Sequence, residues 1–378
     1  MLMMLDGQRT RARRTRLARA WLLSLTTLLA GAAVLPPGPA IPRRVVFSSF
    51  SAPQAAVSEP EPQLAQLEPV LEEVVVTAGQ DLAKTSLDDY AAMRDDQLRT
   101  EAYAAAIRER VSMGAATVLD IGTGPFALLA TIAANAGARK VYAIERTPSV
   151  AQEAQKFVED AGLQEVISVI SGNSQDVVLP EKVDLIVSEL VGNVATGEGV
   201  VETIRDARRR FLREDLLTKP EAMIPARCQT AIAPVMYVNH ELLAAKGPEF
   251  LRPFKLFSET KDLLFLSEPQ LLEDFDLCSF GGPGVGDLQE NEDLDFLIEK
   301  SPSLWPLLFS GFALWPRVVV DPQRVVDIQN AASHWSYVVA LMSKERIPLS
   351  PGQRIALHSE VDLRKVPYSY RLRGTVKR

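Results

Sequence analysis

The stretch AATVLDIGTGPFALLATIAANAGARKVYAIERTP, residues 115–148, decides the fold. It begins with an apolar run that ends at Asp120, and a glycine turn follows at residues 122–124. An Ala/Leu-rich helical segment comes next, and a second apolar run, KVYAI, ends at Glu145. Strand, glycine turn, helix and strand form the repeating unit of a doubly wound parallel sheet. Residues 86–226 are therefore predicted to form a Rossmann-like α/β domain.

The alternation of helices and strands continues on both sides of this stretch. Residues 86–113 contain strong helix formers and no proline, which predicts one helix. Residues 148–161 are predicted to be a further helix, and the apolar runs at 166–170 and 183–190 are predicted to be the third and fourth strands.

The glycine turn indicates an adenosine-containing cofactor. Gly122 and Gly124 let the backbone approach a ligand closely, and Glu145 at the end of the next strand can accept both ribose hydroxyls. The third glycine of a dinucleotide motif is absent, and Asp120 would repel a pyrophosphate. A carboxylate at Asp120 suits a cofactor that carries an ammonium group and a sulfonium group. S-adenosylmethionine is the predicted cofactor, with a dinucleotide or a cofactor-free fold as the alternatives.

The pattern changes after Cys228. Short β-rich runs such as QTAIAPVMYV, ALWPRVVV and SYVVALM, punctuated by proline and glycine, predict an antiparallel β-barrel or sandwich over residues 227–378. Residues 241–275 show helical apolar spacing within it. Taken alone, that segment is a loop with a helix.

The first 44 residues have the composition of a targeting segment. Residues 1–44 hold eight arginines and one acid, and residues 20–35 form an uncharged apolar run that is short for a membrane span. A cleaved or organelle-directing leader is predicted, and a membrane anchor or an apolar helix of the fold are the alternatives. The acid-free segment after Arg43–Arg44 resembles the second half of a two-part plastid leader. Residues 45–85 are rich in Pro, Ser and Glu, which predicts a linker with one short helix.

Composition excludes several classes of function. The net charge is −7 although residues 1–44 carry +7, so the remaining 334 residues carry −14 and favour cationic partners over nucleic acid. The cysteines and histidines are few and lack metal-ligand spacing, so neither a disulfide framework nor a metal site is predicted; they are Cys228, Cys278, His240, His334 and His358.

Residues 89–238 resemble the protein arginine methyltransferase family. Motifs typical of that family occur in the expected order: MRDDQLRTEAY (93–103), VLDIGTG (118–124), KVYAIE (140–145), LPEKVDLIVSELVGNVATGEG (179–199), IPARCQTAIAPV (224–235) and, further on, SHW (333–335). The resemblance implies methyl transfer from S-adenosylmethionine to the guanidinium of arginine in a protein substrate. It also implies that residues 241–275 are a helical dimerisation arm inserted in the β-barrel, and that the chain is a homodimer.

The resemblance makes Glu189 and Glu198 the catalytic pair. A guanidinium is cationic and a poor nucleophile, so an enzyme must hold it and bias its charge toward one nitrogen. Two carboxylates can do this by gripping the planar fork. The stretch LVGNVATG between the two glutamates contains two glycines that can fold it back on itself. The alternative is a pair of solvated loop acids.

Further roles follow from the resemblance, position by position. Arg99 matches the residue that binds the cofactor's carboxylate, Asp120 lies near the cofactor's amino-acid end, and Gln175 takes the place of the glutamate that contacts the adenine amino group. Gly122 and Gly124 pack beneath the cofactor. Met93 shapes the guanidinium pocket. A core methionine and a surface Asp–Arg pair are the alternatives for Met93, Asp96 and Arg99, which helical spacing places along one side of the helix.

The SHW motif completes the predicted site. His334 is predicted to pair with Asp96 and to hold the first helix over the cofactor. Trp335 is predicted to line the arginine channel, with barrel packing as the alternative.

Some positions depart from the family pattern. Pro125–Phe126 replaces Thr-Gly, Tyr90 replaces a histidine, and Leu190 and Asn193 replace aromatic residues. A methyltransferase for a small cationic molecule and a catalytically silent homodimeric binding module therefore remain as alternatives.

Overall fold

The computed structural model describes residues 71–79, 86–247, 252–278, 289–299, 306–329 and 331–377. The predicted leader, residues 1–44, lies outside the described residues, as does most of the predicted linker. None of the helices in these ranges has the length and hydropathy of a membrane span.

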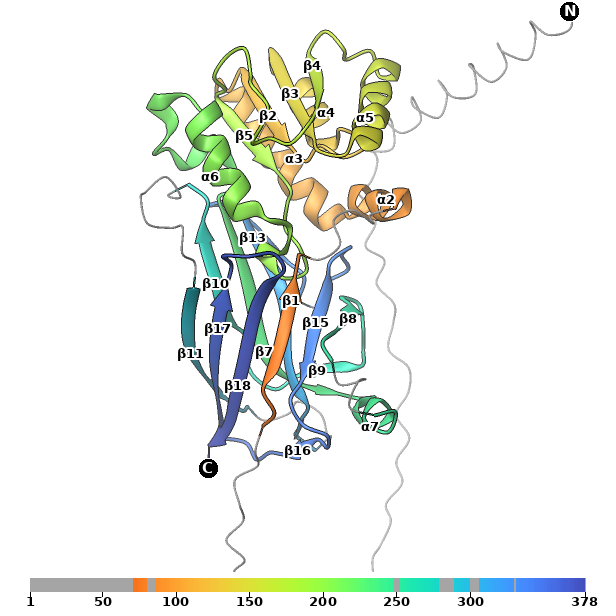
Figure 1. Cartoon of the computed structure of the whole chain (residues 1–378), viewed down its shortest axis with the longest axis vertical. Coiled ribbons are helices and arrows are strands. Elements are labelled where there is room, and N and C mark those ends of the chain that lie inside the picture. The colour runs from red at the N-terminus through yellow and green to blue at the C-terminus, as the bar shows by residue number, and fades with distance from the viewer. Residues whose placement is uncertain are drawn as a thin grey trace, which may run out of the picture. The chain divides into compact units, whose positions relative to one another are not determined.

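A five-stranded parallel sheet forms the first half of the described chain, as predicted (Figure 1). Its order is β4-β3-β2-β5-β6, so β3 and β4 extend to one side of β2 while β5 and β6 extend to the other. The strands are β2 (Thr117–Ile121), β3 (Lys140–Glu145), β4 (Ile167–Ser171), β5 (Leu185–Ser188) and β6 (Met223–Ile224).

The helices of this half pack on strands or on one another. They are α2 (Leu87–Asp95), α3 (Gln97–Ser112), α4 (Leu128–Asn135), α5 (Pro148–Asp160) and α6 (Val200–Phe211), with short 3-10 helices η2 (Ala195–Glu198), η3 (Glu214–Leu216) and η4 (Pro220–Ala222).

The single helix predicted over residues 86–113 is wrong, because the chain breaks at Asp96. Asp96 has φ −68° and ψ 97°, which is not helical, and its carboxylate caps α3 by accepting from Arg99 N at 3.0 Å. Met93 and Arg99 therefore lie on different helices, and the predicted arrangement along one helical side is replaced by a bend.

The second half is an antiparallel β domain, as predicted. A seven-stranded sheet contains the path β10-β7-β13-β15-β8, with β14 and β9 paired to its members, and a four-stranded sheet has the order β1-β18-β17-β11. Its strands are β1 (Val74–Ala78), β7 (Arg227–Tyr237), β8 (Phe254–Phe257), β9 (Leu263–Phe265), β10 (Gln270–Asp276), β11 (Gln289–Leu297), β12 (Leu308–Phe309), β13 (Gly311–Asp321), β14 (Arg324–Asp327), β15 (Ser336–Leu341), β16 (Ile347–Pro348), β17 (Arg354–Asp362) and β18 (Tyr368–Lys377).

The helical arm predicted over residues 241–275 is largely absent from the described part of that segment. It contains one five-residue helix, α7 (His240–Ala244), followed by β8, β9 and β10. Pro253 and Pro269 directly precede β8 and β10, where a continuing helix would clash. The alternation FKLF in β8 fits a strand with one covered face.

The predicted linker also contains a strand. Residues 74–78, VVVTA, form β1 and pair with β18 from Val74↔Leu372 to Ala78↔Tyr368. Three consecutive valines favour a strand, and Val74 and Val76 turn inward while Val75 faces solvent. This segment therefore belongs to the β domain.

Candidate active site

A pocket of about 200 Å³ lies at the carboxyl edge of the parallel sheet. Its walls come from α2, the turn after β2, the end of β3 and the segments that follow β4 and β5. The strand order reverses between β2 and β5, and ligands bind at such reversal points in open α/β sheets.

The turn after β2 requires its glycines. Gly122 and Gly124 have φ of +76° and +63°, a region that other residues rarely adopt. A Cβ on Gly122 would lie 2.7 Å from Leu190 Cδ2. The backbone N–H groups of Gly122 and Thr123 both donate to Ile144 O, at 2.9 and 3.1 Å, which fixes the turn against β3.

Asp120 lies beneath this turn and is not among the residues that line the pocket. Its Oδ2 accepts from Thr123 Oγ1 at 2.6 Å and from Ala130 N at 3.0 Å, so it joins the turn to α4. Burial, and to a lesser extent the charge of Glu145, raises the pKa of Asp120 to about 7. Its predicted place near the cofactor's amino-acid end stays a prediction, and the contacts present are structural.

Glu145 ends β3 and lines the pocket. Its Oε2 accepts from Gly124 N at 3.1 Å, and its Oε1 accepts from Thr147 N at 2.9 Å. Each carboxylate oxygen has a second lone-pair direction, so both can still accept from a ligand hydroxyl. The glycine turn and the acid therefore form one connected unit.

Gln175 does not line the pocket. Its side chain is exposed, and its backbone N donates to Asn173 Oδ1 at 3.2 Å in a tight turn. Asn173 and Ser174 line the pocket instead. The predicted adenine contact of Gln175 has no support in this geometry.

Glu189 and Glu198 both line the pocket. Between them the chain folds back so closely that a Cβ on Gly192 would lie 3.4 Å from Gly197 Cα. Burial, followed by the negative charge of Glu189, raises the pKa of Glu198 to about 7. The two carboxylates thus converge closely enough for one to influence the ionisation of the other, and the alternative of two solvated loop acids does not describe them.

Arg99 is partnered within the protein. Its guanidinium forms an ion pair with Glu189 Oε2 and donates to Met93 O at 2.6 Å, while Glu189 Oε1 accepts from Val191 N at 3.2 Å. Glu189 is therefore held in one orientation. A guanidinium has five N–H donors, so the predicted contact with a cofactor carboxylate remains open to Arg99. Met93 lines the pocket.

Asp96 and His334 are in contact. His334 Nδ1 lies 2.7 Å from Asp96 Oδ2, which also accepts from Ser333 Oγ at 2.6 Å and from His334 N at 3.0 Å. Burial opposes ionisation of Asp96, but these hydrogen bonds, first that of the His334 side chain, hold its pKa well below the ordinary value. The contact joins the bend between α2 and α3 to the β domain, and neither residue lines the pocket.

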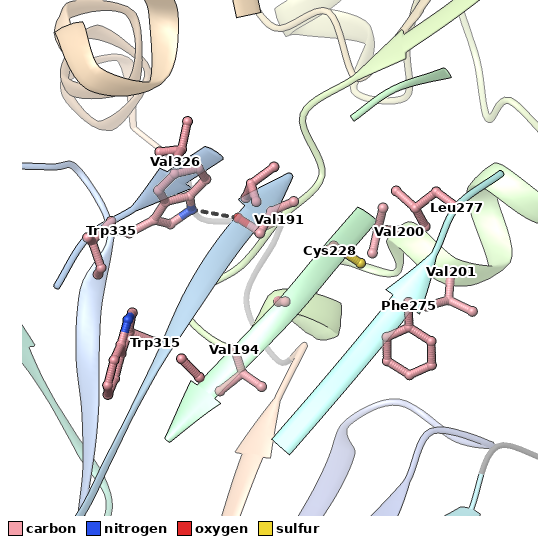
Figure 2. Close-up of a cluster of buried hydrophobic side chains, with 14 of the residues drawn as sticks. Val191, Val194, Val200, Val201, Cys228, Phe275, Leu277, Trp315, Val326 and Trp335 are labelled. Atoms are coloured by element: carbon pink, nitrogen blue, oxygen red, sulfur yellow. Dashed lines mark hydrogen bonds between the residues drawn. The ribbon is translucent and has the colours of Figure 1, made fainter. Parts of the chain in front are cut away.

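Trp335 supports the segment between the two glutamates from behind. Its Nε1 donates to Val191 O at 2.7 Å (Figure 2), and the residue is 3% exposed. The next residue, Ser336, donates its backbone N–H to Asn193 Oδ1 at 2.6 Å. Trp335 is not among the residues that line the pocket, so the packing alternative describes its position.

Other lining residues were not predicted as site residues. Tyr90 lies against the glycine turn, where a Cβ on Gly124 would be 3.4 Å from its ring. Burial, then the charges of Glu145 and Glu198, raises the pKa of Tyr90. Phe126 lies in the wall, edge-on to Phe157 at 6.2 Å. For Tyr90, the sequence did carry a signal, because a tyrosine stands where the family pattern has a histidine.

Comparison with known proteins identifies the relatives of this region. The family model described as PRMT5 arginine-N-methyltransferase matches residues 80–218. Rice (Oryza sativa subsp. japonica) protein arginine N-methyltransferase PRMT10 is 38% identical over 141 residues, which are 37% of this chain and 35% of the rice protein. Drosophila erecta histone-arginine methyltransferase CARMER is 40% identical over 144 residues, 38% of this chain and 26% of the fly protein. The match thus spans about a third or less of these relatives.

The fold extends beyond the region of sequence similarity. The solved structure of the Trypanosoma brucei PRMT1 enzyme–prozyme heterotetrameric complex with AdoHcy superimposes with a TM-score of 0.62 at 20% identity. The superposition covers 76% of this chain and 98% of that chain. The parallel sheet and the antiparallel β domain therefore share the fold of that chain.

Proposed function

We propose that this chain, whose residues 80–218 belong to the protein arginine N-methyltransferase family, transfers a methyl group from S-adenosylmethionine to an arginine guanidinium nitrogen of a protein. The observation that supports the arginine acceptor best is the convergence of Glu189 and Glu198 on one pocket beside the glycine turn. Two acids held this close favour the entry of a cation.

The residues of the pocket fit the proposed cofactor. Glu145 presents two acceptor oxygens next to the glycine turn, as a ribose diol requires. Arg99 supplies the cation for the carboxylate of the cofactor's amino-acid part, and the acids favour its positive groups. When bound, S-adenosylmethionine supplies a methyl group on a positively charged sulfur, and a guanidinium nitrogen is the nucleophile.

The two glutamates have different tasks in this proposal. Glu189 is already oriented by Arg99 and by Val191 N, so it is a fixed acceptor for one edge of the guanidinium. Within the described residues, no hydrogen bond reaches the Glu198 carboxylate, so it is available to the substrate. An arriving cation favours ionisation of Glu198, and together the two carboxylates draw positive charge away from the reacting nitrogen.

The test is methyl transfer by the full chain. With methyl-labelled S-adenosylmethionine, we expect mass spectrometry to find methylated arginine in an Arg/Gly-rich peptide and none in the same peptide with lysine at every arginine. Free arginine is the third arm. Transfer only to free arginine would establish the small-molecule alternative, and binding of cofactor without any transfer would establish the silent binding module.

Glu198→Gln tests the pair itself. We expect it to lower kcat/KM about 100-fold or more, the scale for a lost charged group that stabilises a transition state. Cofactor affinity, measured calorimetrically, should stay within a few-fold of the original. Glu202→Gln, an exposed residue in the first turn of α6, is the matched control and should retain activity. If Glu198→Gln and Glu202→Gln are equally active, the proposed role of Glu189 and Glu198 in holding the guanidinium is wrong.

We also propose that the chain forms a homodimer, as the family resemblance implies. Light scattering coupled to size exclusion should give twice the 41.5 kDa of one chain. A monomer mass at micromolar concentration would contradict this.

We propose, in addition, that residues 1–44 direct the chain to an organelle, the plastid in the first instance, because arginine is abundant and acid scarce in them. A fluorescent protein fused after residue 60 should enter plastids of an algal cell, and the same fusion with the arginines changed to serine should not. Retention at another membrane would support the anchor alternative.

A further inference from the structure

We infer that Glu273 is a positioning residue for Glu198: it holds the turn that carries Glu198 through a buried cluster of hydroxyl groups. This inference rests on the proposed role of Glu198 in holding the substrate guanidinium. The cluster consists of Glu273, Thr196, Thr230 and Tyr370, and none of these residues touches the pocket.

The carboxylate of Glu273 accepts hydrogen bonds from three hydroxyl groups. Glu273 Oε1 accepts from Thr196 Oγ1 at 3.0 Å and from Tyr370 OH at 2.9 Å, and its Oε2 accepts from Thr230 Oγ1. The hydroxyls of Thr196 and Tyr370 also contact each other. All four side chains are at most 2% exposed. In such a buried site, water does not readily replace a lost hydrogen-bond partner, so the loss of one hydroxyl costs free energy.

The cluster joins three separate parts of the fold. Glu273 lies on β10 and Thr230 on β7, both in the seven-stranded sheet, whereas Tyr370 lies on β18 in the four-stranded sheet. Thr196 lies in η2, the 3-10 helix that ends at Glu198. The position of η2 is therefore tied to both sheets of the β domain at one point.

Backbone contacts connect this point to Glu198. Ala195 N donates to Thr230 Oγ1 at 3.0 Å, and Gly199 N donates to Thr196 O at 3.0 Å. Glu198 thus lies inside a turn whose first residues are fixed by the cluster. Because no hydrogen bond reaches its own carboxylate within the described residues, the direction of that side chain depends on this backbone.

The two glutamates are supported by different contacts. Glu189 is held by Arg99 and lies next to the segment bound by Trp335 and Ser336. The Glu273 cluster supports the opposite end of the segment, at Thr196. Loss of the cluster should therefore disturb Glu198 and leave Glu189, the glycine turn and Glu145 in place.

The test compares two substitutions of one hydroxyl in the full chain. Thr196→Val removes the hydroxyl with little change of shape, whereas Thr196→Ser keeps it. We expect Thr196→Val to lower kcat/KM for the arginine peptide about tenfold or more, mainly through kcat, with cofactor affinity within twofold of the original. Thr196→Ser should stay within about threefold in both quantities. Glu273→Gln should resemble Thr196→Val.

Asp274→Asn is the matched control for Glu273→Gln. Asp274 is the next residue on β10, and it pairs at the surface with Arg227 and Gln229. Melting temperatures of all variants report folding. Equal losses of activity in Thr196→Ser, Thr196→Val and Asp274→Asn would show general destabilisation and overturn the inference, as would unchanged kinetics in Thr196→Val.

A second readout does not depend on activity. In protein with ¹³C-labelled glutamate side chains, assigned with Glu198→Gln, the Glu198 carboxyl should titrate near pH 7 in the original chain and in Asp274→Asn, and at lower pH in Thr196→Val. An unchanged midpoint in Thr196→Val would overturn the inference. If the original chain transfers no methyl group, the proposed function fails, and this titration alone decides the role of Glu273.

Discussion

Glu198 combines burial with a neighbouring negative charge, and both raise its pKa to about 7. The protonated form therefore dominates below this pH and has no charge with which to attract a guanidinium. We expect kcat/KM for an arginine peptide to rise with pH through about 7 and then level off. A bound cation lowers the pKa of Glu198, so the corresponding limb of kcat should lie at lower pH.

The measurement is a pair of pH–rate profiles between pH 5.5 and 9. The residual activity of Glu198→Gln should lose the limb near pH 7, and Glu202→Gln should keep it. A profile in the original chain that is flat across this range would contradict the ionisation argument while leaving methyl transfer itself intact.

The substitution Gly122→Ala tests whether the turn after β2 needs a glycine at this position. An alanine there must adopt φ +76° and place its Cβ 2.7 Å from Leu190 Cδ2. We expect Gly122→Ala to cost about 1–2 kcal/mol in the free energy of unfolding from backbone strain, and to weaken cofactor binding about tenfold or more. Gly162→Ala is the control, because Gly162 has φ +72° and open space around it. Equal cofactor affinity in both variants would show that the turn does not need its close approach.

The residues of the turn could be predicted because their geometry is local. Gly122, Gly124 and Glu145 lie within one strand–helix–strand unit, and hydrogen bonds inside that unit join them. Gln175 could not be placed in the same way, because the short turn at Asn173 directs its side chain outward.

At the scale of elements, the bend between α2 and α3 shows a contact that sequence spacing does not reveal. Residues 86–113 contain neither proline nor glycine, and the first glycine, Gly114, lies beyond the last helical residue. The partners of Asp96 are Ser333 and His334, which lie 237 and 238 positions away in the chain. Local propensity favours a continuous helix, and this distant contact accounts for the break.

Asp96→Ala should therefore destabilise the protein. It removes the cap of α3 and leaves Ser333 and His334 without their acceptor, which together cost about 2–4 kcal/mol in the free energy of unfolding. Asp95→Ala, at an exposed residue that pairs with Arg94, should change it by about 0.5 kcal/mol or less. Urea unfolding at pH 7 measures both. A loss below 1 kcal/mol for Asp96→Ala would show that the bend does not depend on this acid.

The sequence predicted the antiparallel β class of the second domain but not all of its strands. Short β-rich runs punctuated by proline and glycine predicted strands after Cys228, and β7, β13, β15, β17 and β18 confirm them. Over residues 241–275 the helical spacing alone indicates a loop with a helix, and the family resemblance implies a helical arm, whereas Pro253 and Pro269 oppose a long helix there. β1 was missed because an acidic, proline-rich segment precedes it, although VVV is a strand signal by itself.

At the scale of the whole molecule, the segment before the Rossmann-like domain completes the β domain. Strand β1 pairs with β18 over five residues, and Glu73 forms ion pairs with Arg371 and Arg373. Directly after β1, Gly79 approaches the turn that carries Glu198, and a Cβ on Gly79 would lie 3.0 Å from Gly197 O. Residues 80–218, which match the family model, exclude this strand.

A chain that begins at residue 66 should therefore retain methyl transfer, whereas one that begins at residue 80 should lose both stability and activity. Without β1, β18 loses its hydrogen-bonded neighbour, the core loses Val74 and Val76, and the turn at Gly197 loses its contact with Gly79. Melting temperature and kcat/KM for the arginine peptide measure the two effects.

Substitutions in the full chain separate the role of β1 from that of chain length. Val76 is 1% exposed and Val75 is 38% exposed on the opposite face of the same strand. Val76→Asp buries a charge in the β domain and should lower both melting temperature and activity, while Val75→Asp should leave both near the original values. If the chain that begins at residue 80 and Val76→Asp are both as active as the original, β1 is dispensable, and the position of Glu198 depends only on contacts within residues 86–377.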